Sequence, residues 1–296
     1  MKKIISIIFL FIFTLNSFSN DKELNNVVNY GFLQGYDMLA DFKDARKSLS
    51  KWLNRVGEKK DVNLNVIFYD DREKVYKSYM SNSLNMASME FGDYYKRKDK
   101  IDSISSRYWS VAFNEKREYK FCLVARSDIK FDSYKDLKDK TIIMKEYQSI
   151  GSIWLDHKSL QNTKKEFNKL VKSIKYEEKE STSLLNVFFK KQDLALVRKD
   201  TWATMLELNP SIKQRVKLFE CSSVDFIPFI SFFSKSTDNT TVDIFFDAFK
   251  NLKNDKDIKE LYSLFKFYDV YEVKKENLSD MNNFYKRYYE LKEKYK

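Results

Sequence analysis

The stretch at residues 119–152, YKFCLVARSDIKFDSYKDLKDKTIIMKEYQSIGS, constrains the fold of this chain more than any other segment. Two short apolar runs in it predict buried strands, and the polar residues between and after them predict turns and helix starts. In order, the predicted elements are a strand at 119–126, one helical turn at 134–138, a strand at 141–144 and a helix start at 148–152. Asp132 and Ser133 can cap the short helix. This alternation is typical of an α/β fold.

Small and polar residues stand where the helix after the second strand begins, namely Gln148, Ser149, Gly151 and Ser152. A helix N-terminus presents unpaired backbone N–H groups, so hydroxyl side chains at that position favour the binding of an anion. The same residues also suit a capped helix that binds nothing. An anion site is therefore one of two interpretations of this segment.

The rest of the chain repeats the alternation of strands and helices. Strands are predicted at residues 26–33, 63–69, 84–89, 107–113, 171–176, 193–198, 216–221 and 230–233. Helices are predicted at residues 42–55, 72–80, 152–168, 181–190, 202–208, 242–252, 258–265 and 279–295. Strands separated by helices predict parallel sheets with right-handed crossovers, so we expect two doubly wound α/β lobes joined by a two-strand hinge.

Ligands of open α/β sheets bind beyond the carboxyl ends of the strands. In the first lobe, this rule selects the polar residues that follow predicted strands: Tyr36, Asp70, Ser88, Glu90 and Tyr94. Each of them can equally be a cap or a turn residue. Glu90 is unfavourable beside an anion because like charges repel, but it suits a ligand that also carries an amine.

Arg198 ends a predicted strand of the second lobe. At a strand end that faces a cleft, its planar guanidinium can contact a carboxylate or a phosphate through two hydrogen bonds. The alternative is a surface arginine paired with Asp200 or Glu207.

The first 19 residues predict a secretory signal peptide, with Lys2 and Lys3 before the apolar run at 4–13 and a cleavage site after Ser19. No cysteine stands directly after this run to carry a lipid anchor, and no later segment is long and apolar enough to span a membrane, so we expect a protein free in the periplasm. The formal net charge of the whole chain is +11 and falls by two on cleavage. Export argues against a nucleic-acid partner, and lysines interleaved with acidic residues predict a solvated surface.

Two cysteines, Cys122 and Cys221, fall in predicted strands. In an oxidising compartment they can form a disulfide, and as buried thiols they can equally act as small apolar side chains. His157 is the single histidine and lies beside Asp156 in a predicted helix, where we expect a surface residue. One histidine and two remote cysteines predict no metal site, no cofactor and no catalytic constellation, which leaves an enzyme as the remote alternative.

The order of these elements resembles the phosphate/phosphonate-type periplasmic substrate-binding proteins of ABC transporters, a branch of the type II periplasmic binding protein fold. The resemblance rests on the DLKDK segment at residues 136–140 and on the polar helix start that follows it. There, Ser149 matches the Ser-rich pattern of the family, while Ile150 and Gly151 stand in place of hydroxyl residues. The ELNP sequence at residues 207–210 is a further match.

This resemblance implies a small anionic or zwitterionic, phosphonate-like ligand, captured between two closing lobes for an ABC permease. The expected first lobe comprises residues 20–113 and 227–296, and the second comprises residues 119–222. The expected ligand contacts are Tyr36, Ser88, Glu90, Tyr94, Gln148, Ser149, Ser152 and Arg198. The same binding fold also suits a periplasmic sensor module of a membrane signalling protein.

Overall fold

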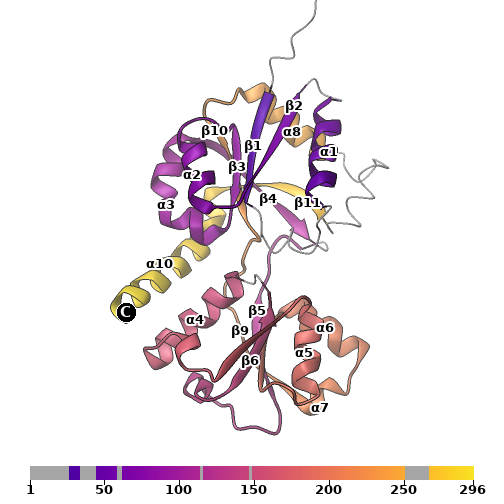
Figure 1. Ribbon diagram of the computed structural model, residues 1–296, viewed down its shortest axis with the longest axis vertical. Coiled ribbons are helices and arrows are strands. Elements are labelled where there is room, and N and C mark those ends of the chain that lie inside the picture. Colours follow the sequence, from indigo (N-terminus) through magenta and orange to yellow (C-terminus); the bar gives the residue numbers. More distant parts are fainter. Residues whose placement is uncertain (1–26, 34–44, 59–61, 114–115, 147–148, 251–266) are drawn as a thin grey trace, which may run out of the picture.

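The computed structural model describes residues 27–33, 45–58, 62–113, 116–146, 149–250 and 267–296. These residues form two α/β lobes, shown one above the other in Figure 1, and each lobe is built on a mixed sheet that carries helices on its faces. The expected fold class, two α/β lobes, is confirmed. In the described part of the chain, no helix is long and apolar enough to cross a membrane.

The sheet of the first lobe has the strand order β11-β4-β10-β3-β1-β2. Its strands are β1 (Val27–Leu33), β2 (Asn63–Tyr69), β3 (Met86–Met89), β4 (Ser105–Phe113), β10 (Ile230–Ser234) and β11 (Phe267–Val273). β1 pairs in parallel with β2 and β3, whereas β10 runs antiparallel to β3 and β4. The chain returns from the second lobe at β10, which therefore enters the sheet from the edge where the parallel strands end.

The helices of the first lobe match the predictions only in part. They are α1 (Ala45–Glu58), α2 (Arg72–Met80), α3 (Phe91–Ile104), α8 (Asn239–Lys250), η4 (Lys275–Leu278) and α10 (Ser279–Lys294). Asp71 caps α2 by accepting hydrogen bonds from the backbone N–H groups of Glu73 and Lys74, at 2.6 and 3.1 Å. α3 and β11 were not predicted, and the helix expected at 258–265 lies outside the described residues.

The sheet of the second lobe has the strand order β7-β6-β8-β5-β9. Its strands are β5 (Phe121–Arg126), β6 (Thr141–Lys145), β7 (Ser173–Glu177), β8 (Leu194–Arg198) and β9 (Val216–Cys221). β6, β7 and β8 are parallel, and β5 runs antiparallel to β8 and β9. The sequence predicts parallel sheets, and this prediction is wrong for both lobes because each sheet also contains antiparallel pairs. The reason is the same in each: the strand that enters from the other lobe must run against the parallel set.

The helices of the second lobe follow its strands closely. They are η1 (Tyr134–Leu137), α4 (Ser149–Thr163), η2 (Phe167–Lys169), α5 (Glu180–Phe188), α6 (Lys199–Leu208) and α7 (Ile212–Arg215). Ser133 caps η1 as predicted, in a capping box with Asp136. α4 begins at Ser149, three residues before the predicted start.

Two segments cross between the lobes, one after β4 and one after β9. They pair with each other at Tyr119 and Phe226, whose backbone N–H groups donate reciprocally to the partner's carbonyl at 2.8 Å. This pairing forms a two-strand connection of the kind expected for a hinge. The limits of the lobes at residues 113, 119, 222 and 227 stay a prediction.

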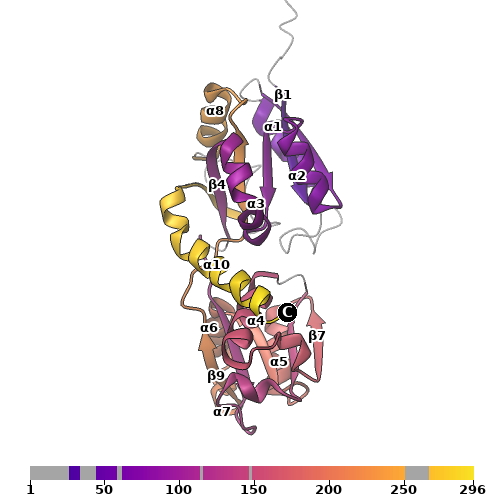
Figure 2. The same cartoon turned by 90° about the vertical axis from the view of Figure 1, so that its left-hand side faces the viewer.

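Helix α10 packs against both lobes (Figure 2). Its Tyr285 ring lies 5.4 Å from Phe91 on α3, measured between ring centroids. Its Phe284 ring lies 4.9 Å from His157 on α4. His157 is buried under α10, so the expectation of a surface histidine is wrong. The sequence could not show this burial because it depends on a helix that follows more than 100 residues later.

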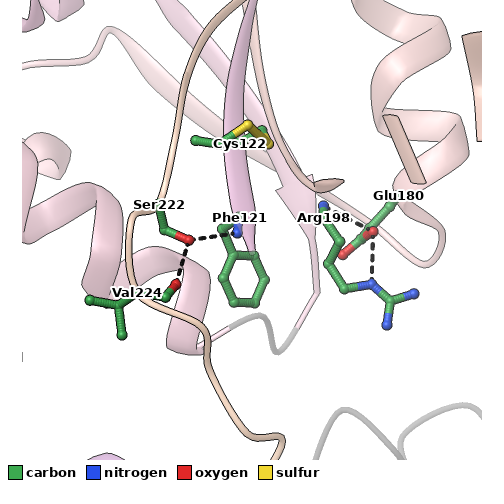
Figure 3. Close-up of a disulfide and its surroundings, with 7 residues drawn as sticks. Phe121, Cys122, Glu180, Arg198, Ser222 and Val224 are labelled. Carbon is green, nitrogen blue, oxygen red and sulfur yellow. Dashed lines mark hydrogen bonds and ion pairs between the residues drawn. A yellow bond between two sulfur atoms is a disulfide. The ribbon is translucent and has the colours of Figure 1, made fainter. Parts of the chain in front are cut away.

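Cys122 and Cys221 form a disulfide between neighbouring strands β5 and β9 (Figure 3). The two residues are register partners at the end of the sheet where both crossing segments enter the lobe. Of the two possibilities that the sequence left open, the structure has the disulfide.

Candidate functional site

The carboxyl ends of the parallel strands in each lobe point toward the other lobe (Figure 1). In the first lobe, β2 and β3 lead there into α2 and α3, and in the second lobe β6, β7 and β8 lead into α4, α5 and α6. We call these two regions the facing edges. They come close to each other beside Gly92 on α3. If this glycine carried a Cβ atom, as an alanine would, that atom would lie 3.6 Å from Cδ1 of Ile153 on α4. The N-terminal parts of α3 and α4, one from each lobe, are thus brought together.

Helix α4 begins on the facing edge of the second lobe with two of the predicted residues. Ser149 is its first residue and Ser152 follows within the first turn, and both are half-buried. The Ser152 hydroxyl lies 3.3 Å from Sδ of Met144 at the end of β6. The first turn of α4 holds no acidic residue. The positive end of this helix dipole therefore lacks a carboxylate of its own, which suits an anion.

Arg198 lies on the same edge, held by a buried carboxylate. Glu180, the first residue of α5, accepts hydrogen bonds from the backbone N–H and Nε of Arg198 at 3.2 and 3.3 Å. It also accepts one from the Thr201 hydroxyl at 2.5 Å. Figure 3 shows that Nε of Arg198 faces Glu180 while the two terminal nitrogens point away from it. Glu180 therefore fixes the orientation of the guanidinium fork.

Two further contacts restrain the Arg198 side chain. Its Nε lies 3.6 Å from a carboxylate oxygen of Asp200, and its guanidinium carbon lies 4.9 Å from the centre of the Tyr119 ring. The ion pair with Asp200 is one that the surface alternative expected, but the side chain is half-buried rather than on the outer surface. Its role as a ligand contact stays a prediction.

A hollow of about 340 Å³ lies beside this arginine, at the base of the two crossing segments. Tyr119 lines it together with charged residues of both signs, among them Lys116, Glu118, Lys199 and Asp200. Because the charges are mixed, the hollow has no net preference for an anion.

Two predicted residues of the first lobe, Ser88 and Tyr94, lie in the core. Ser88 is hydrogen-bonded to the Tyr30 hydroxyl at 2.6 Å and to Ser231 on β10. The Tyr94 hydroxyl donates to Asp102 at 2.9 Å, and burial raises the pKa of Tyr94. In this conformation neither hydroxyl is presented at the facing edge, so geometry does not favour them as ligand contacts.

The charged groups at the facing edge of the first lobe come from α2 and α3. Glu90 is the N-cap residue of α3, and its carboxylate lies 3.6 Å from a terminal nitrogen of Arg72. The other terminal nitrogen of Arg72 lies 3.3 Å from Asp93. The structure therefore brings Glu90 to the edge where the sequence expected it and adds Arg72 and Asp93 as its neighbours.

Of the eight predicted contacts, Glu90, Ser149, Ser152 and Arg198 lie at the facing edges. Tyr36 and Gln148 lie outside the described residues. Sequence reasoning missed Arg72 and Glu180. Each is the first residue of a helix that follows a parallel strand, and this position was the signal that could have identified both.

Comparison with protein-family models gives a match to the periplasmic substrate-binding protein of phosphonate ABC transporters, over residues 40–278. A comparison with curated protein sequences found no significant match.

Several solved structures share the fold at low sequence identity. A protein from Xanthomonas citri bound to ATP has a TM-score of 0.62 at 9% identity, covering 90% of this chain and 98% of that one. A binding-protein component of an ABC phosphonate transporter from Pseudomonas aeruginosa has a TM-score of 0.59 at 14% identity, covering 90% and 88%. PhnD1 from Prochlorococcus marinus in complex with methylphosphonate has a TM-score of 0.56 at 14% identity, covering 88% and 98%. These likenesses concern the fold alone.

Proposed function

Because this chain belongs to the family of periplasmic substrate-binding proteins of phosphonate ABC transporters, we propose that it captures a small anionic or zwitterionic, phosphonate-like ligand between its two lobes. Closure about the two crossing segments traps the ligand. The captured ligand is then delivered to an ABC permease in the membrane. The signal peptide predicted at residues 1–19 supports capture in the periplasm.

One observation carries the proposal: α4 begins at the facing edge with Ser149 and without an acidic residue in its first turn. Backbone N–H groups and hydroxyls there can donate to an anion, and the helix dipole favours negative charge. The other lobe is close by, since Gly92 and Ile153 approach each other across the gap. An anion at α4 is thus within reach of polar groups from both lobes, which is what ligand-driven closure requires.

The test is a thermal-shift screen of the mature chain, residues 20–296, against phosphate, methylphosphonate, 2-aminoethylphosphonate, a sulfonate, a carboxylate and amino acids. A ligand at 100 times its Kd should stabilise the protein by about 2.7 kcal/mol, which raises the Tm by several degrees. Choline, which has a cation and no acidic group, is the matched negative control. If no compound with an anionic group stabilises the protein, the proposal fails.

A further inference from the structure

Helix α10 meets one helix from each lobe beside Gly92. A Cβ atom on this glycine would lie 3.1 Å from Cε1 of Tyr285, which is closer than side chains normally approach, and 3.6 Å from both Cδ1 of Ile153 and the Tyr289 hydroxyl. The Tyr289 hydroxyl also donates a hydrogen bond to the Gly92 carbonyl at 3.4 Å. Because Gly92 lies in the first turn of α3 and Ile153 lies on α4, the helices α3, α4 and α10 pack at one point, which we call the three-helix junction.

The crossing segments also connect the lobes, and α10 extends from them to the three-helix junction. The Phe284 ring on α10 lies 5.1 Å from the Phe226 ring in the second crossing segment, measured between centroids. Phe226 is the residue whose backbone pairs with Tyr119 of the first crossing segment. Tyr285, the next residue of α10, contacts Gly92 at the junction. The helix therefore links the two places where the lobes are joined.

Contacts on both sides hold α10 in place. On the side of the first lobe, the Tyr95 ring of α3 stacks on Tyr289, with the ring centroids 5.9 Å apart. On the side of the second lobe, the buried Asp156 carboxylate of α4 accepts the hydrogen bond from Tyr288 at 3.1 Å. The helix is thus fixed to both lobes within two turns of the junction.

Two points of contact between two rigid bodies define an axis of rotation. Here one point is the pairing of Tyr119 with Phe226, and the other is the three-helix junction. A rotation about the line through both points preserves both contacts, whereas a twist about the crossing segments alone pulls α4 away from Gly92. Atoms near the axis of a hinge move least, so packed contacts beside it can persist while the lobes close.

We propose that the three-helix junction at Gly92 is a second pivot of the hinge, and that α10 restricts the lobes to a closing rotation about the line from this junction to the crossing segments. This inference goes beyond the proposed function, in which the crossing segments alone form the hinge. Gly92 suits a pivot because it has no side chain to collide with Ile153 when α4 turns against α3. Lobes whose motion is restricted before the ligand arrives lose less conformational entropy when they close.

The experiment measures the distances between two spin labels, one on each lobe, by pulsed electron–electron double resonance in the ligand-free mature chain. The labels are attached at Lys77→Cys on α2 and at Lys191→Cys after α5, two exposed positions. The native Cys122 and Cys221 are joined in the disulfide, so they do not take up label. The width of the distance distribution reports how freely the lobes move relative to each other.

Two variants weaken the three-helix junction from different sides. Ile153→Ala removes the α4 side chain that approaches Gly92. Tyr289→Leu removes the ring that stacks on α3 and the hydrogen bond to the Gly92 carbonyl. The Tm of each variant is measured alongside to confirm that it is folded.

Two further variants are the controls. Val187→Ala removes fully buried apolar atoms from the core of the second lobe, so it lowers stability without touching the junction. Lys286→Ala changes an exposed residue of α10. It tests whether any substitution in this helix alters the motion of the lobes.

We expect a wider distance distribution in Ile153→Ala and in Tyr289→Leu than in the wild type, and the wild-type width in Val187→Ala and Lys286→Ala. An unchanged width in either junction variant, or an equal widening in Val187→Ala, overturns the second pivot. Because the measurement uses no ligand, such a result leaves the proposed function intact. The thermal-shift screen tests that function separately.

Discussion

The Tyr288 hydroxyl on α10 donates a hydrogen bond to the buried Asp156 carboxylate on α4, at 3.1 Å, and so ties the C-terminal helix to the second lobe. The same carboxylate accepts from the backbone N–H of Phe167 at 3.0 Å and lies 3.4 Å from Nζ of Lys292. Because Tyr285 of the same helix packs on α3 of the first lobe, α10 joins the two lobes independently of the crossing segments.

Replacement of Tyr288 by Phe keeps the ring and removes the hydrogen bond. A hydrogen bond to a buried charged group contributes about 1–3 kcal/mol, so we expect the free energy of unfolding to fall by about that much. Urea unfolding at neutral pH measures the change. Tyr295→Phe, at the C-terminal end of the same helix, is the control and should be nearly neutral. Equal stability of Tyr288→Phe and the wild type would show that this contact does not anchor α10.

The Cys122–Cys221 disulfide closes a loop that contains almost the whole second lobe, with a sequence separation of 99 residues. A crosslink restricts the unfolded chain, and the loss of entropy grows with the length of the closed loop. For a loop of about 100 residues, this effect stabilises the folded state by about 4.7 kcal/mol in the chain-entropy account. We expect the double variant Cys122→Ala/Cys221→Ala to be about 2–5 kcal/mol less stable in urea unfolding. The wild type under reducing conditions is the control and should show a similar loss. A double variant as stable as the oxidised wild type would contradict this account.

Burial lowers the pKa of His157 to about 4, with Lys158 and Arg287 as smaller contributors. An unfolded histidine titrates near pH 6.5, so between about pH 6.5 and 4 the unfolded state binds more protons than the folded state. The stability from this residue is therefore complete above about pH 6.5 and falls as the pH falls, by at most about 3 kcal/mol at pH 4. The raised pKa of Asp156 acts in the opposite sense at the acid end, because its folded carboxyl takes up a proton more readily.

The measurement is the free energy of unfolding between pH 4 and 7 for the wild type and for His157→Gln, which does not titrate. The slope with pH should be smaller in the variant, whatever its absolute stability. Parallel curves would mean that His157 is not the group responsible.

The sequence identifies elements whose signals are local. β2 and α2 match their predicted ranges, because an apolar run ends at Asp70 and Asp71 caps the helix that follows. α3 was missed because its buried residues cluster at residues 91–94, and the charged run at residues 96–100 separates them from the next buried residue, Ile101. Tyr94 was assigned to the ligand edge, yet it is buried through contacts with Tyr108 and Phe232, and Phe232 is far away in the sequence.

The candidate site shows the same division between local and distant signals. The polar start of α4 can be recognised from consecutive residues, and Ser149 and Ser152 lie where expected. The ion pairs between Glu180 and Arg198, and between Arg72 and Asp93, join residues from different elements. Only the folded structure brings these partners together, so neither Glu180 nor Arg72 could be selected from sequence by charge alone.

If Ser149 donates to an anion at the start of α4, Ser149→Ala should weaken ligand binding by about 1–3 kcal/mol, as for a hydrogen bond to a charged group. The Tm of the ligand-free protein should change little. Calorimetry with the tightest-binding compound of the screen gives the affinity. Asn162→Ala, exposed near the other end of α4, is the control. Unchanged affinity in Ser149→Ala would leave only the capping interpretation of this serine.

The last prediction concerns Arg198, whose guanidinium Glu180 orients at the end of β8. Arg198→Lys keeps the charge and removes the planar fork, so the binding of a carboxylate or phosphonate should weaken by about tenfold or more, roughly 1.4 kcal/mol, if the contact is bidentate. Arg126→Lys is a matched control. Arg126 is also half-buried and paired with two carboxylates, Asp128 at 2.9 Å and Asp193 at 3.5 Å, and it ends β5 at the opposite edge of the same sheet.

Both substitutions disturb an ion pair within the lobe, so both should lower the Tm of the ligand-free protein to a similar extent. Only Arg198→Lys should also weaken binding in calorimetry, because only its side chain lies on the edge that faces the first lobe. Equal affinities in the two variants would show that Arg198 serves the structure of the lobe through Glu180 and Asp200 and does not contact the ligand.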